Sequence, residues 1–577
     1  MTRLQCYIQT SIQFENAFIS NDFINVDDLA NSNVKFGVLH LKINKTEPIV
    51  KKRHIVFSVD CSGSMSDITD DGRSKMDHSN HTLMNMIIYF ANHPELLVSI
   101  SVFAFDGSIY KIIENTEITQ DNLDDLIKEV KNIRPKDTTD IEKALINSND
   151  YISKYISNIN NENDVDIVHI FMTDGDATQG KQNPSELKEL VTPLVTSIFI
   201  GFGVDHNSYL LKELSSHNNN AYYFVDALEK SGLVYGEILH SYIYKIFENT
   251  CISVKNGLLY DWKKNIWVDK LDVGYLVGET NKTIHILSSN LNDFECIIES
   301  KDCLSKELIN LPVKNNIADG FVDLSKYKYR QRTQQLLFEV NTYNFNNIIK
   351  GDDYENFWEK QMENKHILRD KMKNLLEEMK QLLEKVVQKD ENQLLEKVVQ
   401  KDEDEYSSFI KMLCDDIYVC LQTFDTRYGA MYSCARQLSQ GSQRSYSANY
   451  TSSQKQHNLN YNTTSPKLLR SYAFNSQIDE YDEEYVFRPM FPEIEETQLD
   501  SSFNLSLKKP PSDCNSNDNV SIIRFRDYDS EFNSNENGID DLSNDNYKVS
   551  EQIDNPYISQ SILDMMRSCS ASIDEYK

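Results

Sequence analysis

Three separate stretches of the chain carry hydroxyl and carboxylate side chains of the kind that bind a hard metal ion. Asp60, Ser62 and Ser64 form the pattern D-x-S-x-S, Thr139 stands just before a stretch with helical spacing, and Asp174 lies in Thr-Asp-Gly. Two carboxylates and three hydroxyls are ligands that hold Mg²⁺ without saturating its charge. Such a set leaves a coordination position that a carboxylate of another protein can fill.

Each fragment alone is a weak signal. A serine shortly after an aspartate is common in turns and helix N-caps, and Thr-Asp-Gly is a common exit from a strand. The three fragments occur in order, with spacings of about 75 and 35 residues, on a regular framework of strands and helices. This combination favours one metal site over three unrelated turns.

The elements that would position these residues are buried strands. A short apolar run, 54–59, precedes the first fragment, and a second run, 165–172, precedes Thr-Asp-Gly. Runs of this kind are typical of strands buried on both faces of a parallel sheet. Strand-like and helical segments alternate up to about residue 247, which predicts an α/β fold with a doubly wound, mostly parallel, Rossmann-like sheet. Ligands bind such a sheet at its carboxyl edge, where the strand order reverses.

The three fragments resemble the metal-ion-dependent adhesion site of von Willebrand factor A (VWA) domains. The resemblance covers residues 53–247, and it includes the later stretches 201–203 and 222–226. It implies the VWA fold and a role in metal-dependent adhesion to another protein.

The resemblance also implies a role for each candidate ligand. Ser62 and Ser64 would contact the ion directly, and Thr139 would join directly or through water. Asp60 and Asp174 would hold the ion partly through waters. The family usually has two small residues before the threonine, whereas this chain has Asp-Thr at 137–138, which adds negative charge near the ion.

The rest of the chain differs in pattern from the α/β region. Residues 251–343 carry short strand-like segments, one starting at Leu336, and they predict a small antiparallel β-domain. In the N-terminal segment, 1–52, an alternation over 34–40 is typical of a strand at a sheet edge, and this strand can join the β-domain.

Two further regions follow. Residues 344–437 have helical spacing and contain an 11-residue word, 381–391, that recurs from Gln393; we expect it in a solvent-exposed helix or helix tip. Residues 438–577 are rich in Ser, Asn and Asp, which predicts a largely disordered acidic tail. Its short apolar stretches (apolar islands), among them Ile562-Leu563 with Met565-Met566, are either docking motifs or chance occurrences.

The segments after the α/β region resemble the companion region of intracellular proteins that join a VWA domain to an intein-like β-module. Some such proteins carry RING or U-box modules, but no zinc-ligand spacing for a RING occurs here, so ligase activity is not supported. Cys251 has no recognisable self-splicing partners, which favours a core cysteine.

Composition restricts the partners and the compartment. The chain has 577 residues and a net charge of −30, from 59 basic against 89 acidic residues, so its surface would repel nucleic acid. None of its ten cysteines forms C-x-x-C, and scattered cysteines suggest reduced thiols. The start lacks the apolar core of a signal peptide, and no stretch approaches the ~20 apolar residues of a membrane span. We therefore expect an intracellular, cytoplasmic protein.

These observations favour an interaction module or scaffold, not an enzyme, that binds an acidic residue of a protein partner through Mg²⁺, with Mn²⁺ or Ca²⁺ also compatible. Self-assembly through the helical region is an alternative. A Mg²⁺-dependent hydrolase is a weaker one, because no phosphate-binding Gly loop occurs. The sequence also shows no positioned base: His54 precedes a strand, and His78 and His81 are expected on a helix surface.

Overall fold

The computed structural model describes fourteen stretches of the chain, and all structural statements below refer to them. They are residues 7–18, 34–68, 72–136, 138–159, 165–175, 177–203, 206–217, 219–225, 228–313, 323–346, 354–390, 397–424, 429–443 and 557–571.

A six-stranded sheet carries the three candidate fragments. Its order is β5-β4-β3-β6-β7-β8, and every neighbouring pair is parallel except β4 and β5. The strands are β3 (Lys52–Asp60), β4 (Val98–Phe105), β5 (Ile109–Glu117), β6 (Val165–Thr173), β7 (Thr196–Phe202) and β8 (Ala221–Val225). The prediction of a mostly parallel, doubly wound sheet is confirmed. Strand order reverses between β3 and β6, because the chain leaves β3 toward β4 and returns on its other side.

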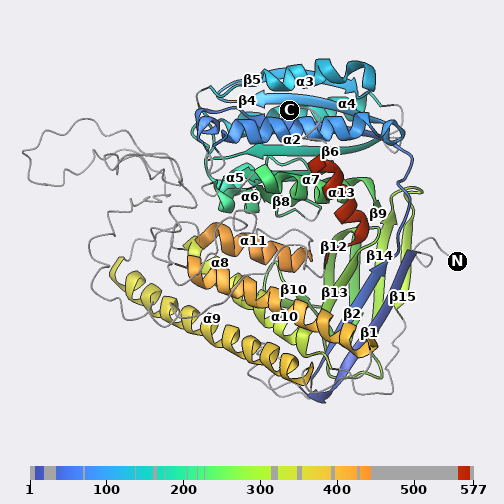
Figure 1. Ribbon diagram of the computed structural model, residues 1–577, viewed down its shortest axis with the longest axis vertical. Helices are drawn as coiled ribbons and strands as arrows, with labels where there is room; N and C mark the ends of the chain where they lie inside the picture. The colour runs from blue at the N-terminus through green and yellow to red at the C-terminus, as the bar shows by residue number, and fades with distance from the viewer. Residues whose placement is uncertain are drawn as a thin grey trace, which may run out of the picture.

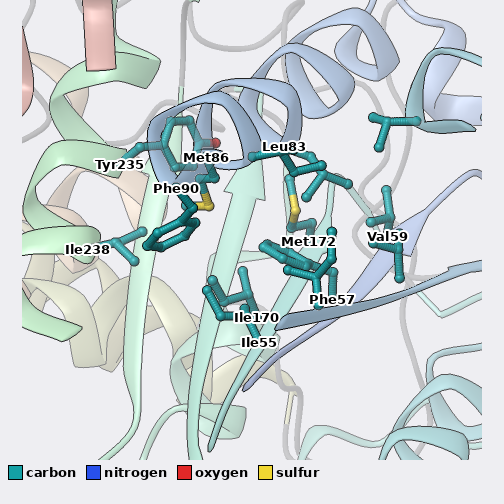
Figure 2. Close-up of a cluster of buried hydrophobic side chains, with 14 of the residues drawn as sticks. Ile55, Phe57, Val59, Leu83, Met86, Phe90, Ile170, Met172, Tyr235 and Ile238 are labelled. Carbon is teal, nitrogen blue, oxygen red and sulfur yellow. The ribbon is translucent and has the colours of Figure 1, made fainter. Parts of the chain in front are cut away.

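Helices cover both faces of this sheet (Figure 1). One face is covered by α2 (Lys75–Ala91), α3 (Leu123–Lys131) and α7 (Leu228–Ile243), and the other by α4 (Ile141–Ser157), α5 (Pro184–Lys188) and α6 (Ser208–Leu214). Adjacent residues of β6 divide between the two cores, since Ile170 joins the first and Phe171 the second. Figure 2 shows the first core, where Leu83, Met86 and Phe90 of α2 pack against the sheet.

The ends of two helices differ from those that the apolar spacing predicts, namely a helix over Leu83–Phe90 and a closing helix over Leu228–Phe247. α2 begins at Lys75, well before the apolar stretch from Leu83, because the Ser74 hydroxyl and the Asp77 carboxylate form a capping box. α7 ends at Ile243 rather than at residue 247, and strand β9 (Lys245–Lys255) starts two residues later.

Two antiparallel sheets enclose a third core. One has the order β1-β2-β13-β10-β11 and the other β12-β9-β14-β15. Their strands are β1 (Ile8–Phe18), β2 (Lys35–Ile43), β9 (Lys245–Lys255), β10 (Leu258–Asp261), β11 (Ile266–Val268), β12 (Lys270–Val277), β13 (Asn281–Ser288), β14 (Glu295–Asp302) and β15 (Leu308–Val313). The expectation that 34–40 forms an edge strand is wrong, because β2 pairs with β1 on one side and β13 on the other.

The helical region consists of α8 (Ser325–Asn346), α9 (Tyr354–Asp390), α10 (Lys397–Thr423) and α11 (Gly429–Ser442). The strand expected from Leu336 is instead part of α8, where Leu336, Leu337 and Val340 are buried on one helical face. In the first copy of the repeated sequence, residues 381–390 form the end of α9. In the second copy, residues 397–403 lie in α10.

One further helix, α13 (Gln560–Ala571), lies near the C-terminus and runs beside α7 (Figure 1). The expectation of disorder is therefore wrong for residues 560–571, because three apolar residues on one helical face pack against the folded chain. Residues 444–556, where most of the predicted tail falls, lie outside the described residues. No helix in the described stretches is both long and apolar enough to cross a membrane.

Candidate metal centre

The two candidate carboxylates lie at the same edge of the sheet. Asp60 is the last residue of β3, and Asp174 directly follows β6. These strands are parallel neighbours, paired up to Val59 and Met172, so their carboxyl ends emerge together. Both carboxylates are buried, with 0% and 2% of each residue exposed. The site thus lies where the strand order reverses, as the sequence predicts for this fold.

A chain of hydrogen bonds connects the D-x-S-x-S loop to Asp174. The Asp60 Oδ1 atom accepts from the Ser62 backbone N–H at 2.7 Å, which shapes the turn into the short 3₁₀ helix Gly63–Ser66. The hydroxyls of Ser62 and Ser64 are 3.1 Å apart, and Ser64 Oγ donates to Asp174 Oδ1 at 2.8 Å. Four of the five predicted residues therefore form one hydrogen-bonded cluster.

Thr139 lies at this edge without a direct hydrogen bond to the other four among the described contacts. Its backbone N–H donates to Thr178 Oγ1 at 2.8 Å, and its carbonyl accepts from the Thr178 backbone N–H at 2.9 Å. The next residue, Asp140, caps α4 and donates its N–H to the Asp106 carbonyl at the end of β4. Thr139 is buried, whereas Thr138 directs its hydroxyl toward Gly107. Residue 137 lies outside the described residues.

The two carboxyl groups of the cluster differ in their surroundings. Burial, followed by the nearby Asp174 carboxylate, raises the pKa of Asp60 to about 7. One ammonium group approaches, since Lys75 Nζ lies 2.9 Å from Asp174 Oδ2 with only 6% of its side chain exposed. When Asp60 is ionised, the two carboxylates and one ammonium group leave a net negative charge at a buried place. A buried charge of this kind is costly unless a cation compensates it.

The sequence model of the von Willebrand factor type A domain matches residues 54–235, the stretch that builds this sheet and its edge. Residues 54–235 form a von Willebrand factor type A domain. Domains of this family are typically metal-dependent protein-interaction modules rather than enzymes, and those with the adhesion site bind divalent metals.

Known proteins match this chain over limited stretches. Inter-alpha-trypsin inhibitor heavy chain H3 of Rattus norvegicus is 28% identical over 180 residues, which are 30% of this chain and 19% of that protein. The Mus musculus protein of the same name is 28% identical over 176 residues. The chain therefore spans about a fifth of the length of these relatives.

Two solved structures are similar to this chain at low sequence identity. The ArnB paralog VWA2 from Sulfolobus acidocaldarius is 12% identical, with a TM-score of 0.42, and the alignment covers 76% of this chain and 99% of that one. The von Willebrand factor type A protein from Catenulispora acidiphila is 11% identical, with a TM-score of 0.42 and coverage of 59% and 82%.

The side chains at the edge of the VWA domain suit a hard ion. Their donors are carboxylate and hydroxyl oxygens, and Thr173 Oγ1 adds a hydrogen bond of 2.5 Å to Asp60 Oδ2. Among the described residues, no cluster of three or more His, Cys, Asp or Glu side chains is placed to hold a metal. The arrangement therefore offers oxygen donors to a divalent metal ion.

Lys75 is the residue of this site that the sequence reasoning missed. The capping box of Ser74 and Asp77 places it in the first position of α2. That local signal is readable as S-x-x-D, but it does not show that the start of α2 lies above the end of β6. Only the packing of α2 on the sheet brings the ammonium group to Asp174.

The histidines of the VWA domain occupy other places than expected. His54 lies inside β3 with its Nδ1 atom 2.7 Å from Ser99 Oγ, and burial lowers its pKa to about 4. His78 is buried in α2 with 2% exposed, so the expectation of a surface position is wrong; His81 is half-buried. The apolar face of α2 is wider than the sequence pattern from Leu83 indicates.

Proposed function

We propose that the VWA domain holds a Mg²⁺ ion at Asp60, Ser62, Ser64, Thr139 and Asp174 and uses it to bind a protein partner through an Asp or Glu side chain. The observation that carries this proposal is the hydrogen-bonded cluster joining the D-x-S-x-S loop to Asp174 across neighbouring strands. Two buried carboxyl groups share this edge with Lys75 as the ammonium group at Asp174, and this arrangement supports a role for a bound cation.

The proposed roles follow the chemistry of each side chain. Ser62 and Ser64 are neutral direct ligands, and Thr139 is a ligand directly or through water. Asp60 and Asp174 hold the ion partly through waters and supply the negative charge. The bound ion would offer an electrophilic coordination position to a carboxylate of the partner.

Residues around these ligands would orient them. The Ser62 backbone N–H and the Thr173 hydroxyl hold the two oxygens of Asp60 at 2.7 Å and 2.5 Å. Hydrogen bonds of this second layer fix the direction of metal ligands and influence affinity.

Two other functions receive less support. A hydrolase needs a base near the ion, whereas His54 faces Ser99 and Ser101 within the sheet. Self-assembly through the helical region needs an apolar face on its surface, but Leu375, Leu376 and Met379 are buried within the chain.

The proposed setting is intracellular. Free thiols are found at Cys61, Cys251, Cys296, Cys303 and Cys420, of which Cys251 is half-buried. Free thiols support a reducing compartment, since disulfides persist mainly in oxidising ones.

The experiment is affinity capture with the full chain in Mg²⁺ buffer and in EDTA, together with direct Mn²⁺ titration. Ser62→Ala and Asp60→Ala should lose the captured partner and the metal. Ser66→Ala is the matched control, because this serine lies in the same loop and its exposed hydroxyl donates to the Gly63 carbonyl instead. Recovery of the same proteins by wild type, Asp60→Ala and EDTA-treated chain would refute the proposal.

A further inference from the structure

α13 packs on the VWA domain through one apolar face. Ile562, Met565 and Met566 are buried, with 4%, 5% and 2% exposed, and their spacing places them on one side of a helix. Met565 belongs to the same core as the residues of α2 and α7. Asp564 and Arg567 lie on the opposite, exposed face. This apolar island is therefore a docking motif, and its receptor is the surface of α7 and α2.

A glycine of α7 shapes the receptor. A Cβ atom added to Gly236 would lie 2.6 Å from Met566 Cα and 2.8 Å from the Met566 backbone nitrogen. The backbones of α7 and α13 thus come together at a position where no side chain fits. A glycine in mid-helix costs about 1 kcal/mol relative to alanine. The helix α7 is therefore less stable at the position where α13 packs against it.

Polar contacts anchor the segment at its start. Ser561 Oγ lies 2.9 Å from His240 Nε2 of α7. Tyr557 donates to Gln440 Oε1 of α11 at 3.2 Å, and its ring centroid lies 5.8 Å from the guanidinium of Arg330. The segment therefore touches the VWA domain and the helical region together.

α13 depends on this surface for its structure. It has 12 residues, and isolated helices of this length are marginal in water. Ordering the helix takes up part of the binding free energy, which keeps such a contact reversible. Methionine side chains also adapt readily to different partners.

We propose that the α7–α2 face is a second ligand-binding surface of the VWA domain. It is separate from the metal edge, by which we mean the sheet edge with Asp60, Ser62, Ser64, Thr139 and Asp174. Its ligand is an amphipathic helix with the spacing Ile-x-x-Met-Met, and the chain's own α13 is its tethered, displaceable occupant. This proposal does not depend on the proposed metal function, because it concerns a different surface.

The test uses full-length chains and a fluorescent peptide of residues 556–572. Met566→Asp places a charge in the apolar contact and should vacate the surface, so this chain should bind the peptide at least tenfold more tightly than wild type, whose surface is occupied. Adding Gly236→Leu to Met566→Asp should abolish that binding. Arg567→Ala, on the exposed face, should behave as wild type.

A second variant covers the case in which Met566→Asp does not fold. Gly236→Ala adds one methyl group and favours the helical conformation of α7 itself. It should release α13, measured as faster amide hydrogen exchange at 560–571, while circular dichroism loses no more helical signal than the 12 residues of α13 supply. Persistent protection of those amides in Gly236→Ala, or equal peptide binding by wild type and Met566→Asp, would overturn the proposal. A concentration-dependent dimer of wild type that Met566→Asp abolishes would overturn the tethered form and assign the surface to α13 of a second copy.

Discussion

Two buried carboxylates of this chain each face a cation, and the two places differ in how complete the pairing is. In the helical region, Asp416 of α10 meets Arg436 of α11, and both side chains are 1% exposed. The Arg436 Nη1 atom donates to Asp416 Oδ1 at 2.6 Å, and Gln440 Nε2 donates to Asp416 Oδ2 at 2.6 Å. Both oxygens are occupied and the charges balance.

At the metal edge the acidic and basic side chains do not balance. Asp174 is paired with Lys75 at 2.9 Å, but a second buried carboxylate, Asp60, has hydroxyl and amide donors and no cation at hydrogen-bonding distance among the described contacts. A complete pair holds helices together, whereas an incomplete one leaves a place for an ion. A carboxylate beside a basic side chain is thus fully paired in the helical region. In the VWA domain we propose that the additional carboxylate, Asp60, takes part in binding an ion.

Breaking the complete pair should have the largest effect. Arg436→Met leaves the Asp416 carboxylate buried without a counter-charge, which should lower the free energy of unfolding by about 3–5 kcal/mol in urea titrations. Arg332→Met is the control, because its partner Glu378 is half-exposed and the loss should stay under about 1 kcal/mol. Equal losses in the two variants would show that burial of the Asp416–Arg436 pair makes no difference to its contribution.

Removing a charge at the metal edge should act in the opposite direction on stability. Asp60→Asn retains an acceptor for the Ser62 N–H but not the charge, so Mn²⁺ affinity should fall by at least about 100-fold in calorimetric titration. In EDTA at pH 8 the same variant should gain on the order of 1 kcal/mol, since the ionised Asp60 is disfavoured by burial and by Asp174. A variant that is less stable in EDTA would show that the site is already balanced.

Lys75 should weaken metal binding through charge repulsion. An ammonium group beside a metal ligand repels a divalent cation, so Lys75→Met should raise Mn²⁺ affinity about tenfold. The metal-free chain should lose stability, because Asp174 loses its partner. Lys143→Met is a suitable control, since this lysine is half-exposed and pairs with Asp140 at 3.3 Å. Unchanged metal affinity in Lys75→Met would mean that the ammonium group moves away when metal binds.

The pH dependence should be no larger than the effect of Lys75→Met. The pKa of Asp60 is raised to about 7 in the metal-free fold, so its contribution to stability is present below pH ~4 and is lost as the pH rises toward 7. Metal binding needs the ionised form, and Mn²⁺ affinity should fall about tenfold from pH 8 to pH 6. A titration that shows equal affinity at both values would contradict this.

Local patterns predicted the parts of the fold that depend on neighbouring residues. The apolar runs before Asp60 and Asp174 identified two buried strands, and the family resemblance identified the domain confirmed at 54–235. Parts that depend on distant packing were missed. Leu336-Leu337 is a short apolar run that suits a strand or a helix, and its contacts with other helices select the helix. Lys75 and the docking of Met566 on Gly236 needed the tertiary structure for the same reason.

The hydrogen bonds of the metal edge join residues far apart in the chain. Thr173 and Asp60 are 113 positions apart, and Asp174 and Ser64 are 110 apart. During synthesis, the first half of the site therefore leaves the ribosome long before the second. Contacts of such sequence separation form late in folding, because a long loop must close first. Metal uptake would thus report that the central sheet has assembled, which makes a bound ion a convenient signal of folding in the newly made chain.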